Sequence, residues 1–135
     1  MESLRDLLRQ EDEDQEFDLL EMLSGVGEDS WRGVLLEANE ILKDPGQKEL
    51  WHRTAAVCYW GVSRVDELPF EKMELVARLY WCLVQYPGFG GEGLSDGENL
   101  VWSIAIDLKG VGYESDWDPM KDPEVMKHFS AMTNT

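Results

Sequence analysis

Apolar residues recur at three- and four-residue intervals along nearly the whole chain, which places them on one face of an α-helix. Near the N-terminus, apolar positions within residues 4–8 and 17–23 bracket an acidic run at residues 11–18. Ser24 and Gly25 then end the segment, since neither favours a continuing helix. The pattern predicts a helical N-terminal region, in which residues 11–14 are a candidate break between two short helices.

The same spacing predicts further helices separated by short turns, at residues 31–43, 47–65, 70–86, 97–108 and 122–132. Asp29 or Ser30 is expected to cap the first of these, and Pro69 is a natural first-turn residue for the third. Segment 70–86 is apolar on most of its circumference, which is typical of a helix at the centre of a bundle.

Two stretches depart from the helical pattern. Residues 87–99 are rich in glycine and are expected to form the longest irregular segment. Residues 101–106 fit a short strand as well as a helix, because their composition conflicts with their period. The sequence therefore predicts an all-α fold, an irregular single-domain bundle of five or six helices over residues 1–135. A strand at residues 101–106 is the open alternative.

The composition adds a strong negative charge to this fold. The chain has 135 residues, with 28 acidic and 12 basic side chains, and its formal net charge is −16. Such a field repels nucleic acid and anionic membranes, and it attracts basic proteins and divalent metals. Direct binding to nucleic acid is therefore disfavoured.

Cysteine usage and hydropathy indicate where such a chain resides. Cys58 and Cys82 lie in apolar helical stretches, and two cysteines in a chain of this size form no disulfide scaffold. No basic segment followed by an apolar run marks a signal peptide at the N-terminus. The most apolar stretch, residues 75–86, is too short to span a bilayer and contains Arg78. These features predict a cytoplasmic protein that does not enter a membrane.

The negative charge is concentrated near the N-terminus. Residues 1–29 carry eleven acidic and two basic side chains, a net charge of −9, whereas residues 30–135 carry 17 and ten, a net charge of −7. Six of the eight residues in the run EDEDQEFD are acidic, namely Glu11, Asp12, Glu13, Asp14, Glu16 and Asp18.

Two interpretations of this run stay open. It is either a solvated helix edge or a surface kept for a positively charged partner. If the run is helical, Asp12 with Glu16 and Asp14 with Asp18 are like-charge pairs four residues apart, and each pair repels. A partner surface explains why such a cost is tolerated.

A second candidate surface is the segment GYESDWDP at residues 112–119. Its large aromatic residues, Tyr113 and Trp117, alternate with carboxylates at Glu114, Asp116 and Asp118. Aromatic anchors among carboxylates suit a basic protein surface, because Trp and Tyr are frequent hot spots and carboxylates complement Arg and Lys. The alternative is that the aromatics, Trp117 above all, fold back onto the core beneath the loop.

Motifs for catalysis or cofactor binding are weak. Asp116-x-Asp118 lacks the glycine and the final glutamate of an EF-hand loop, and Glu49-x-x-His52 has the spacing of one di-iron ligand pair without a second. No phosphate loop or Gly-x-Ser-x-Gly elbow is present. The sequence thus predicts no catalytic residue, metal ligand or cofactor. A divalent-metal-binding protein or an enzyme with a scattered site is the third hypothesis.

In size, acidity and helicity the chain resembles the small acidic immunity proteins that bacteria pair with cationic toxins, although no motif is shared. The resemblance implies an inhibitor that neutralises a basic toxin. The alternative is a phage-type inhibitor that mimics nucleic acid and occupies a DNA- or RNA-binding protein. Concentration of charge at one end favours the immunity hypothesis. The predicted partner-binding residues are the acidic residues of the run 11–18, together with Tyr113, Glu114, Asp116, Trp117 and Asp118.

Overall fold

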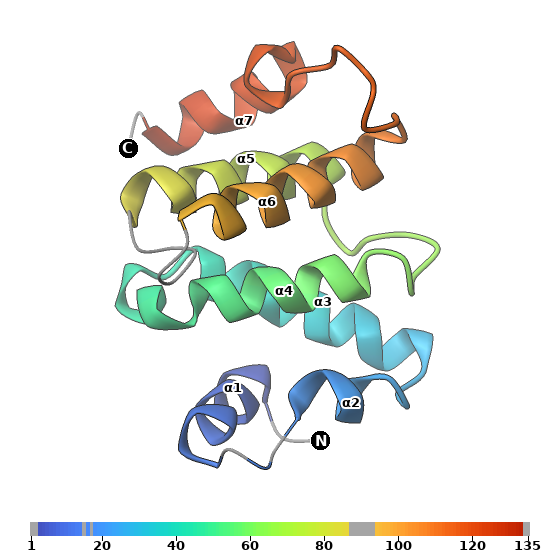
Figure 1. Cartoon of the computed structure of the whole chain (residues 1–135), viewed down its shortest axis with the longest axis vertical. Coiled ribbons are helices and arrows are strands. Elements are labelled where there is room, and N and C mark those ends of the chain that lie inside the picture. Colours follow the sequence, from blue (N-terminus) through green and yellow to red (C-terminus); the bar gives the residue numbers. More distant parts are fainter. Residues whose placement is uncertain (1–2, 15, 17, 87–93, 134–135) are drawn as a thin grey trace. The chain divides into compact units, whose positions relative to one another are not determined.

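The computed structural model describes residues 3–14, 16, 18–86 and 94–133 of the chain (Figure 1). The chain divides into two compact units, an N-terminal unit of residues 1–69 and a C-terminal unit of residues 70–135. The described residues form seven α-helices and two short 3-10 helices, and no strand occurs among them. The all-α prediction is confirmed, whereas the single domain over residues 1–135 stays a prediction.

The N-terminal unit is built from these elements: α1 (Leu4–Glu13), α2 (Leu19–Leu23), α3 (Glu28–Leu42), η1 (Pro45–Leu50) and α4 (Trp51–Gly61). Helices α3 and α4 pack side by side, and α1 packs against α3. The Ser3 side chain caps α1 by accepting a hydrogen bond from the Asp6 N–H at 3.2 Å. The break predicted at residues 11–14 lies slightly later, between the end of α1 and the start of α2.

Leucine and tryptophan side chains from every helix of this unit form its core. The largest fully buried side chains are those of Leu8, Leu19, Leu23, Trp31, Leu35, Ile41, Leu42, Leu50 and Trp51. The Trp51 indole donates a hydrogen bond to the Ile41 carbonyl at 2.9 Å, which satisfies the polar atom of a buried ring. The helical spacing of these residues in the sequence therefore produces the core that it predicts.

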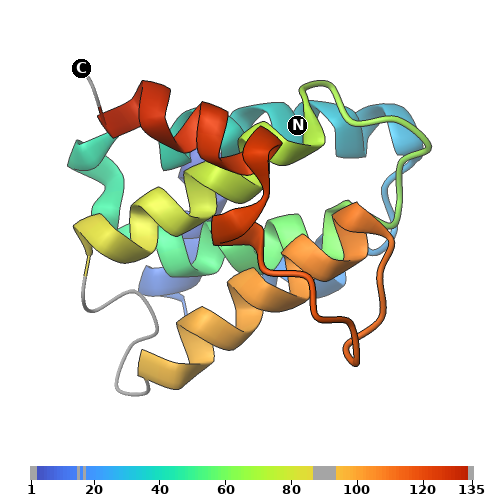
Figure 2. The same ribbon diagram turned by 90° about the horizontal axis from the view of Figure 1, so that it is seen from above.

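The C-terminal unit consists of α5 (Lys72–Gln85), α6 (Leu94–Lys109), η2 (Pro119–Lys121) and α7 (Pro123–Thr133). Helix α5 packs against both α6 and α7, and Figure 2 shows α7 lying along α5. A cluster of small and medium side chains joins the three helices, namely Met73, Val76, Ala77, Ala105 and Val125. Within this unit α5 has the central position that its apolar circumference predicted.

The starts of α3 and α5 differ from the predictions. Helix α3 begins earlier than a cap at Asp29 or Ser30 allows, because Gly27 takes the cap position. Helix α5 begins beyond the first turn that Pro69 was expected to occupy, with Glu71 as its extended cap residue. In both cases the chain enters the helix from an extended backbone at a different residue.

The predicted helix at residues 47–65 is divided and shorter. Gln47 has a non-helical backbone, with φ −114° and ψ 22°, so η1 precedes the regular helix α4. Asp44 caps η1 by accepting a hydrogen bond from the Gly46 N–H at 2.9 Å. The predicted turn at Asp44 therefore opens a 3-10 helix rather than an α-helix.

Helix α6 corrects two further expectations. It begins at Leu94 rather than at residue 97, so residues 94–96 are helical although they were expected to be irregular, while residues 87–93 lie outside the described residues. Residues 101–106 are helical rather than a strand, and Val101, Ile104 and Ala105 are fully buried. No helix among the described residues is long and apolar enough to cross a membrane.

Close packing of α4 against α3 depends on Gly61. A Cβ at this position would lie 2.8 Å from Leu35 Cδ2 and 2.9 Å from two ring carbons of Trp31. We expect Gly61→Ala to lower the free energy of unfolding by about 1–3 kcal/mol, because two fully buried side chains have to move. Urea denaturation measures this change.

Gly33→Ala is the matched control for this substitution. Gly33 lies in α3, and a Cβ there meets nothing within 4 Å. Alanine is the better helix former, so Gly33→Ala should raise the free energy of unfolding by about 0.5–1 kcal/mol. Equal effects of the two substitutions would show that close packing at Gly61 is unimportant.

Candidate functional site

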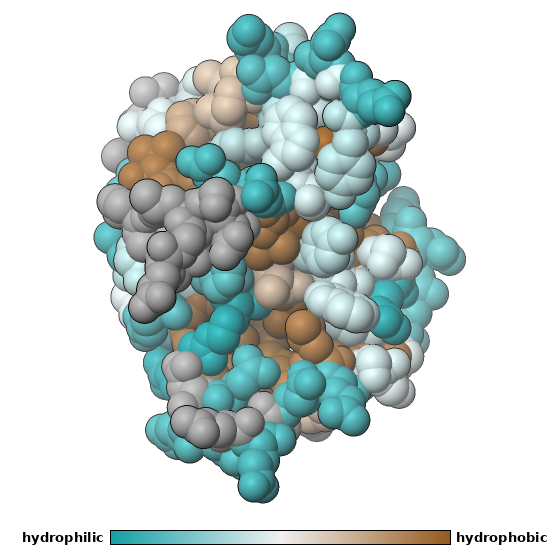
Figure 3. Space-filling model, viewed as in Figure 1, coloured by the Kyte–Doolittle hydropathy of each residue, from teal (hydrophilic) through white to brown (hydrophobic). Residues whose placement is uncertain are grey.

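The acidic run lies where α1 ends and α2 begins. Glu11, Asp12 and Glu13 occupy the last turn of α1, Asp14 follows in an extended conformation, and Asp18 is the cap residue of α2. Figure 3 shows hydrophilic side chains gathered over this end of the N-terminal unit. The run therefore forms two helix ends and their connection rather than one continuous helix. It is called the acidic turn below.

Carboxylates of the acidic turn accept hydrogen bonds from the backbone. Asp14 Oδ1 accepts from the Glu16 N–H at 3.0 Å, and Asp18 Oδ1 accepts from an N–H in the first turn of α2 at 3.2 Å. Glu11 Oε2 accepts from the Leu19 N–H at 3.0 Å and so ties the end of α1 to the start of α2. These bonds satisfy backbone donors and leave the negative charges in place.

The expected repulsion between carboxylates four residues apart on one helix does not occur. Because α1 ends at Glu13, the pairs Asp12–Glu16 and Asp14–Asp18 do not lie on a common helix. A different cost replaces it, since the C-terminal end of a helix carries partial negative charge and disfavours carboxylates by about 0.3–1 kcal/mol each. Helix α1 has no basic residue in its last turn to offset this cost.

Among the described residues, the ion pair at the acidic turn is longer than those elsewhere in the N-terminal unit. Arg32 lies 2.7 Å from Glu28 and 2.8 Å from Asp29, whereas in the acidic turn Glu11 lies 4.0 Å from Arg53. The side chain of Asp12 is outside the described part of the structure. Four exposed carboxylates of the turn have no ion-pair partner within the described ranges, namely Glu13, Asp14, Glu16 and Asp18.

The second predicted surface, the loop at residues 112–119, exposes three of its five predicted contact residues. Tyr113 is 63% exposed, and Glu114 and Asp116 are exposed beside it. The Ser115 N–H donates a hydrogen bond to the Gly112 carbonyl at 3.0 Å, which closes a turn around Tyr113. These side chains are therefore accessible to a partner.

Trp117 in the same loop turns back onto the C-terminal unit. Its indole N–H donates a hydrogen bond to Asp122 Oδ2 at 2.9 Å, and its ring centroid lies 6.4 Å from that of Trp102. Lys109 Nζ lies 5.8 Å from the same ring, and the ring packs against the core cluster of Val76 and its neighbours. Trp117 therefore folds back onto the core beneath the loop, which was the alternative to an exposed anchor. Its contact with a partner stays a prediction.

Asp122 joins three segments of the C-terminal unit. Its side chain is 9% exposed and lies 2.9 Å from Lys109 Nζ. The hydrogen bonds from the Lys109 ammonium and then from the Trp117 indole lower the pKa of Asp122 from 3.8 to about 2, against the opposing effect of burial. Its other oxygen accepts from the Glu124 N–H at 2.9 Å, at the start of α7.

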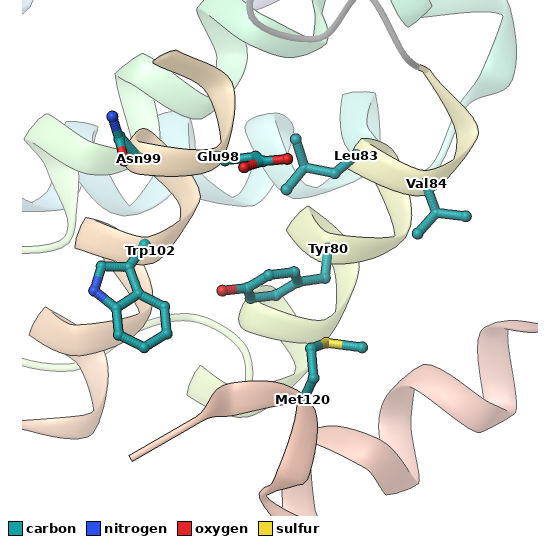
Figure 4. Close-up of a pocket in the computed structure, with 7 residues that line it drawn as sticks. All are labelled: Tyr80, Leu83, Val84, Glu98, Asn99, Trp102 and Met120. Carbon is teal, nitrogen blue, oxygen red and sulfur yellow. The ribbon is translucent and has the colours of Figure 1, made fainter. Parts of the chain in front are cut away.

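A cavity of about 530 Å³ lies between α5, α6 and η2, and the sequence did not predict it (Figure 4). Its described lining residues are Tyr80, Leu83, Val84, Glu98, Asn99, Trp102 and Met120. Asp118, the last predicted loop residue, caps η2 by accepting a hydrogen bond from the Met120 N–H at 3.0 Å.

The cavity was missed because its α5 side chains resemble core residues in the sequence. Tyr80 and Val84 belong to an apolar stretch, yet Val84 is 64% exposed. The available signal was the four-residue spacing of Tyr80 with Val84 and of Glu98 with Trp102, which places each pair on one helix face. That signal does not show that the two faces meet.

Both cysteines are buried. Cys58 and Cys82 form no disulfide, and burial raises the pKa of the Cys58 thiol to about 12, so this thiol is protonated at neutral pH. Among the residues that the structure describes, no three His, Cys, Asp or Glu side chains gather as a metal site requires.

The chain matches no protein-family model, no curated protein and no solved structure in the three comparisons made. The function is therefore argued from the residues and their geometry. The acidic turn belongs to the N-terminal unit, whereas the loop with Tyr113 and the cavity belong to the C-terminal unit.

The hydrogen bonds of Asp122 predict an acid-sensitive contribution to stability. Because its pKa in the folded protein is depressed from 3.8 to about 2, this contribution is present above the higher value and is lost as pH falls through the lower one. The depression corresponds to about 2 kcal/mol. We expect Asp122→Asn to lower the free energy of unfolding by about 1–3 kcal/mol at pH 7.

Urea denaturation of both proteins from pH 7 downward checks this expectation. The gap between them should narrow as the pH approaches 2, where the wild-type carboxylate becomes protonated. The control is Asp116→Asn, an exposed residue of the same loop, for which we expect a change within about 0.5 kcal/mol. A gap that stays constant at all pH values would mean that the charge of Asp122 is not what stabilises the unit.

Proposed function

We propose that this protein binds a basic protein through the acidic turn, and that the partner is a cationic bacterial toxin which it neutralises as an immunity protein. The observation that carries the proposal is the charge left uncompensated at the end of α1. Four exposed carboxylates of the acidic turn, two of them (Glu13 and Asp14) at the end of α1, have no ion-pair partner within the described ranges, and the last turn of α1 has no basic residue.

The carboxylates at the end of α1 cost the free protein stability. Glu13 and Asp14 lie at the C-terminus of the helix, whose partial negative charge they repel. Lys or Arg side chains of a partner would neutralise the carboxylates and relieve the same unfavourable interaction with the helix. The turn therefore gains more from a cationic partner than an equally charged surface that is already compensated.

The backbone hydrogen bonds of the turn support tight binding. Asp14, Asp18 and Glu11 hold the connection between α1 and α2 through bonds that leave their charges available. A preformed surface loses little conformational freedom on binding, and its negative field accelerates encounter with a positive partner. An inhibitor that must capture a toxin quickly needs both properties.

The loop at residues 112–119 supplies a candidate aromatic contact. Tyr113 is the exposed aromatic residue of this loop, with Glu114 and Asp116 exposed beside it. Trp117 donates its indole N–H to Asp122, so Tyr113 is the more accessible anchor. This loop lies in the other unit, and its part in binding is a separate element of the proposal.

The proposal includes a binding rather than a catalytic role, and a cytoplasmic location. Neither of the two buried cysteines forms a disulfide, which suits a reducing compartment. The alternative of a nucleic-acid mimic has less support, because a mimic needs carboxylates spread along a whole face and the acidic turn spans residues 11–18.

The partner is to be isolated by affinity capture from nuclease-treated lysate of the source cell and then used in binding kinetics. We expect the double variant Glu13→Lys/Glu16→Lys to lower the association rate at low salt about tenfold or more, because steering by the turn is lost. Both side chains are exposed, and neither accepts any of the hydrogen bonds described above. Stopped-flow measurements over a range of salt concentrations supply the rates.

The control is Asp66→Lys/Glu67→Lys, which makes the same change in net charge at two exposed residues outside the acidic turn. Its association rate should fall less, and all three proteins should converge at high salt. Equal rates for the two double variants would refute the acidic turn as the binding surface. Capture of a DNA- or RNA-binding machine instead of a toxin would favour the mimic.

A further inference from the structure

The cavity between α5, α6 and η2 combines aromatic walls with apolar surface. Tyr80 projects from α5 toward Trp102 of α6, and Met120 of η2 approaches Tyr80 from a third side (Figure 4). Leu83 and Val84 complete the apolar lining on α5. Aromatic faces attract cations, and the apolar side chains provide contact for methyl or methylene groups.

The polar groups of the cavity are unpaired and on balance negative. Within the described residues, the exposed Glu98 carboxylate has no cationic partner, and no Lys or Arg lines the cavity. The Tyr80 hydroxyl points into the space between α5 and α6, and no hydrogen bond to it occurs in the described part of the chain (Figure 4). These groups are available to a ligand.

The field of two carboxylates reaches the interior of the cavity. Burial, followed by the negative charges of Asp118 and Glu98, raises the pKa of Tyr80 to about 12. The hydroxyl therefore stays protonated at neutral pH, and a cation placed beside it would be stabilised by the same two carboxylates.

The charge and lining of the cavity favour a cation over an anion or a neutral molecule. An anion would meet Glu98 and Asp118 without a basic lining residue to offset them. A neutral apolar molecule would fill the space but would gain nothing from the carboxylates or from the quadrupoles of the aromatic rings. We propose that this cavity binds a small organic cation whose charge is surrounded by apolar groups, such as a quaternary ammonium ion.

The size of the cavity is compatible with a free small molecule. Its volume of about 530 Å³ falls within the range of small-molecule sites, roughly 300–1,000 Å³. The inference does not depend on the proposed binding of a basic protein, because it rests on different residues in the other unit.

The test uses the full chain and two probes of the same shape. Choline is a quaternary ammonium ion, and 3,3-dimethylbutan-1-ol is its uncharged carbon isostere. Isothermal titration calorimetry should detect binding of choline and much weaker binding of the alcohol. Equal affinity for the two probes, or no binding of choline, would overturn the proposal.

Variants locate the binding in the cavity. Glu98→Gln, at an exposed position, should weaken choline binding roughly two- to fivefold. Trp102→Leu should weaken it roughly 2- to 30-fold, because the cation loses an aromatic face. Circular dichroism checks that each variant is folded, and Glu98→Gln remains a test if Trp102→Leu is not.

The matched control is Glu124→Gln, which removes one negative charge from an exposed position on α7 that does not line this cavity. It should leave the affinity for choline within about twofold of wild type, since a solvent-screened charge that does not line the cavity contributes little. If Glu98→Gln and Glu124→Gln have the same effect, the cation is held by the general field and the cavity is not its site.

Discussion

A net charge of −16 on 135 residues is the constraint on which the rest of this structure depends. Like charges on the surface repel, and the compact state survives because apolar side chains are buried beneath them. A fully buried leucine contributes about 1.5–3 kcal/mol, whereas an exposed like-charge pair four residues apart costs about 0.2–0.5 kcal/mol. The buried leucines of the N-terminal unit and the cluster around Val76 in the C-terminal unit outweigh such costs. The fold therefore tolerates like charges placed close together on the surface.

The buried carboxylate of Asp122 is paired with a cation, whereas several exposed carboxylates among the described residues are not. Asp122 is nearly buried, and Lys109 and Trp117 both donate hydrogen bonds to it, as the burial of a charge requires. Glu13 and Glu98 are exposed and have no cationic partner in the described part of the chain. Both proposals rest on such uncompensated carboxylates, one set at the end of α1 and one beside an aromatic cavity. A carboxylate that the fold does not compensate is available to a cation from outside.

The spacing of apolar residues was enough to predict the all-α fold and the central position of α5 within its unit. Helix ends were harder, because they depend on single backbone conformations such as the non-helical Gln47. The acidic turn was identified by composition, and the break between its two helices was predicted at residues 11–14, slightly before its place between Glu13 and Leu19. Its position was inexact because a run of carboxylates has no apolar period to fix a helix end. The cavity could not be predicted, because it needs Tyr80, Trp102 and Met120 to meet from three separate segments. The sequence left open whether Trp117 is exposed or packs against the core. Only its tertiary contacts, such as the hydrogen bond to Asp122, distinguish the two.

The central claim is that the end of α1 carries charge at the expense of the stability of the free protein. The most direct measurement is the free energy of unfolding of Glu13→Lys against wild type, by urea denaturation at low and high salt. We expect the variant to be more stable than wild type by about 0.5–1 kcal/mol at low salt, because a cation replaces an anion at the negative end of the helix. The difference should shrink at high salt, where the interaction is screened. A variant that is no more stable than wild type at low salt would show that the acidic turn costs the fold nothing, and the argument for a missing cationic partner would lose its basis.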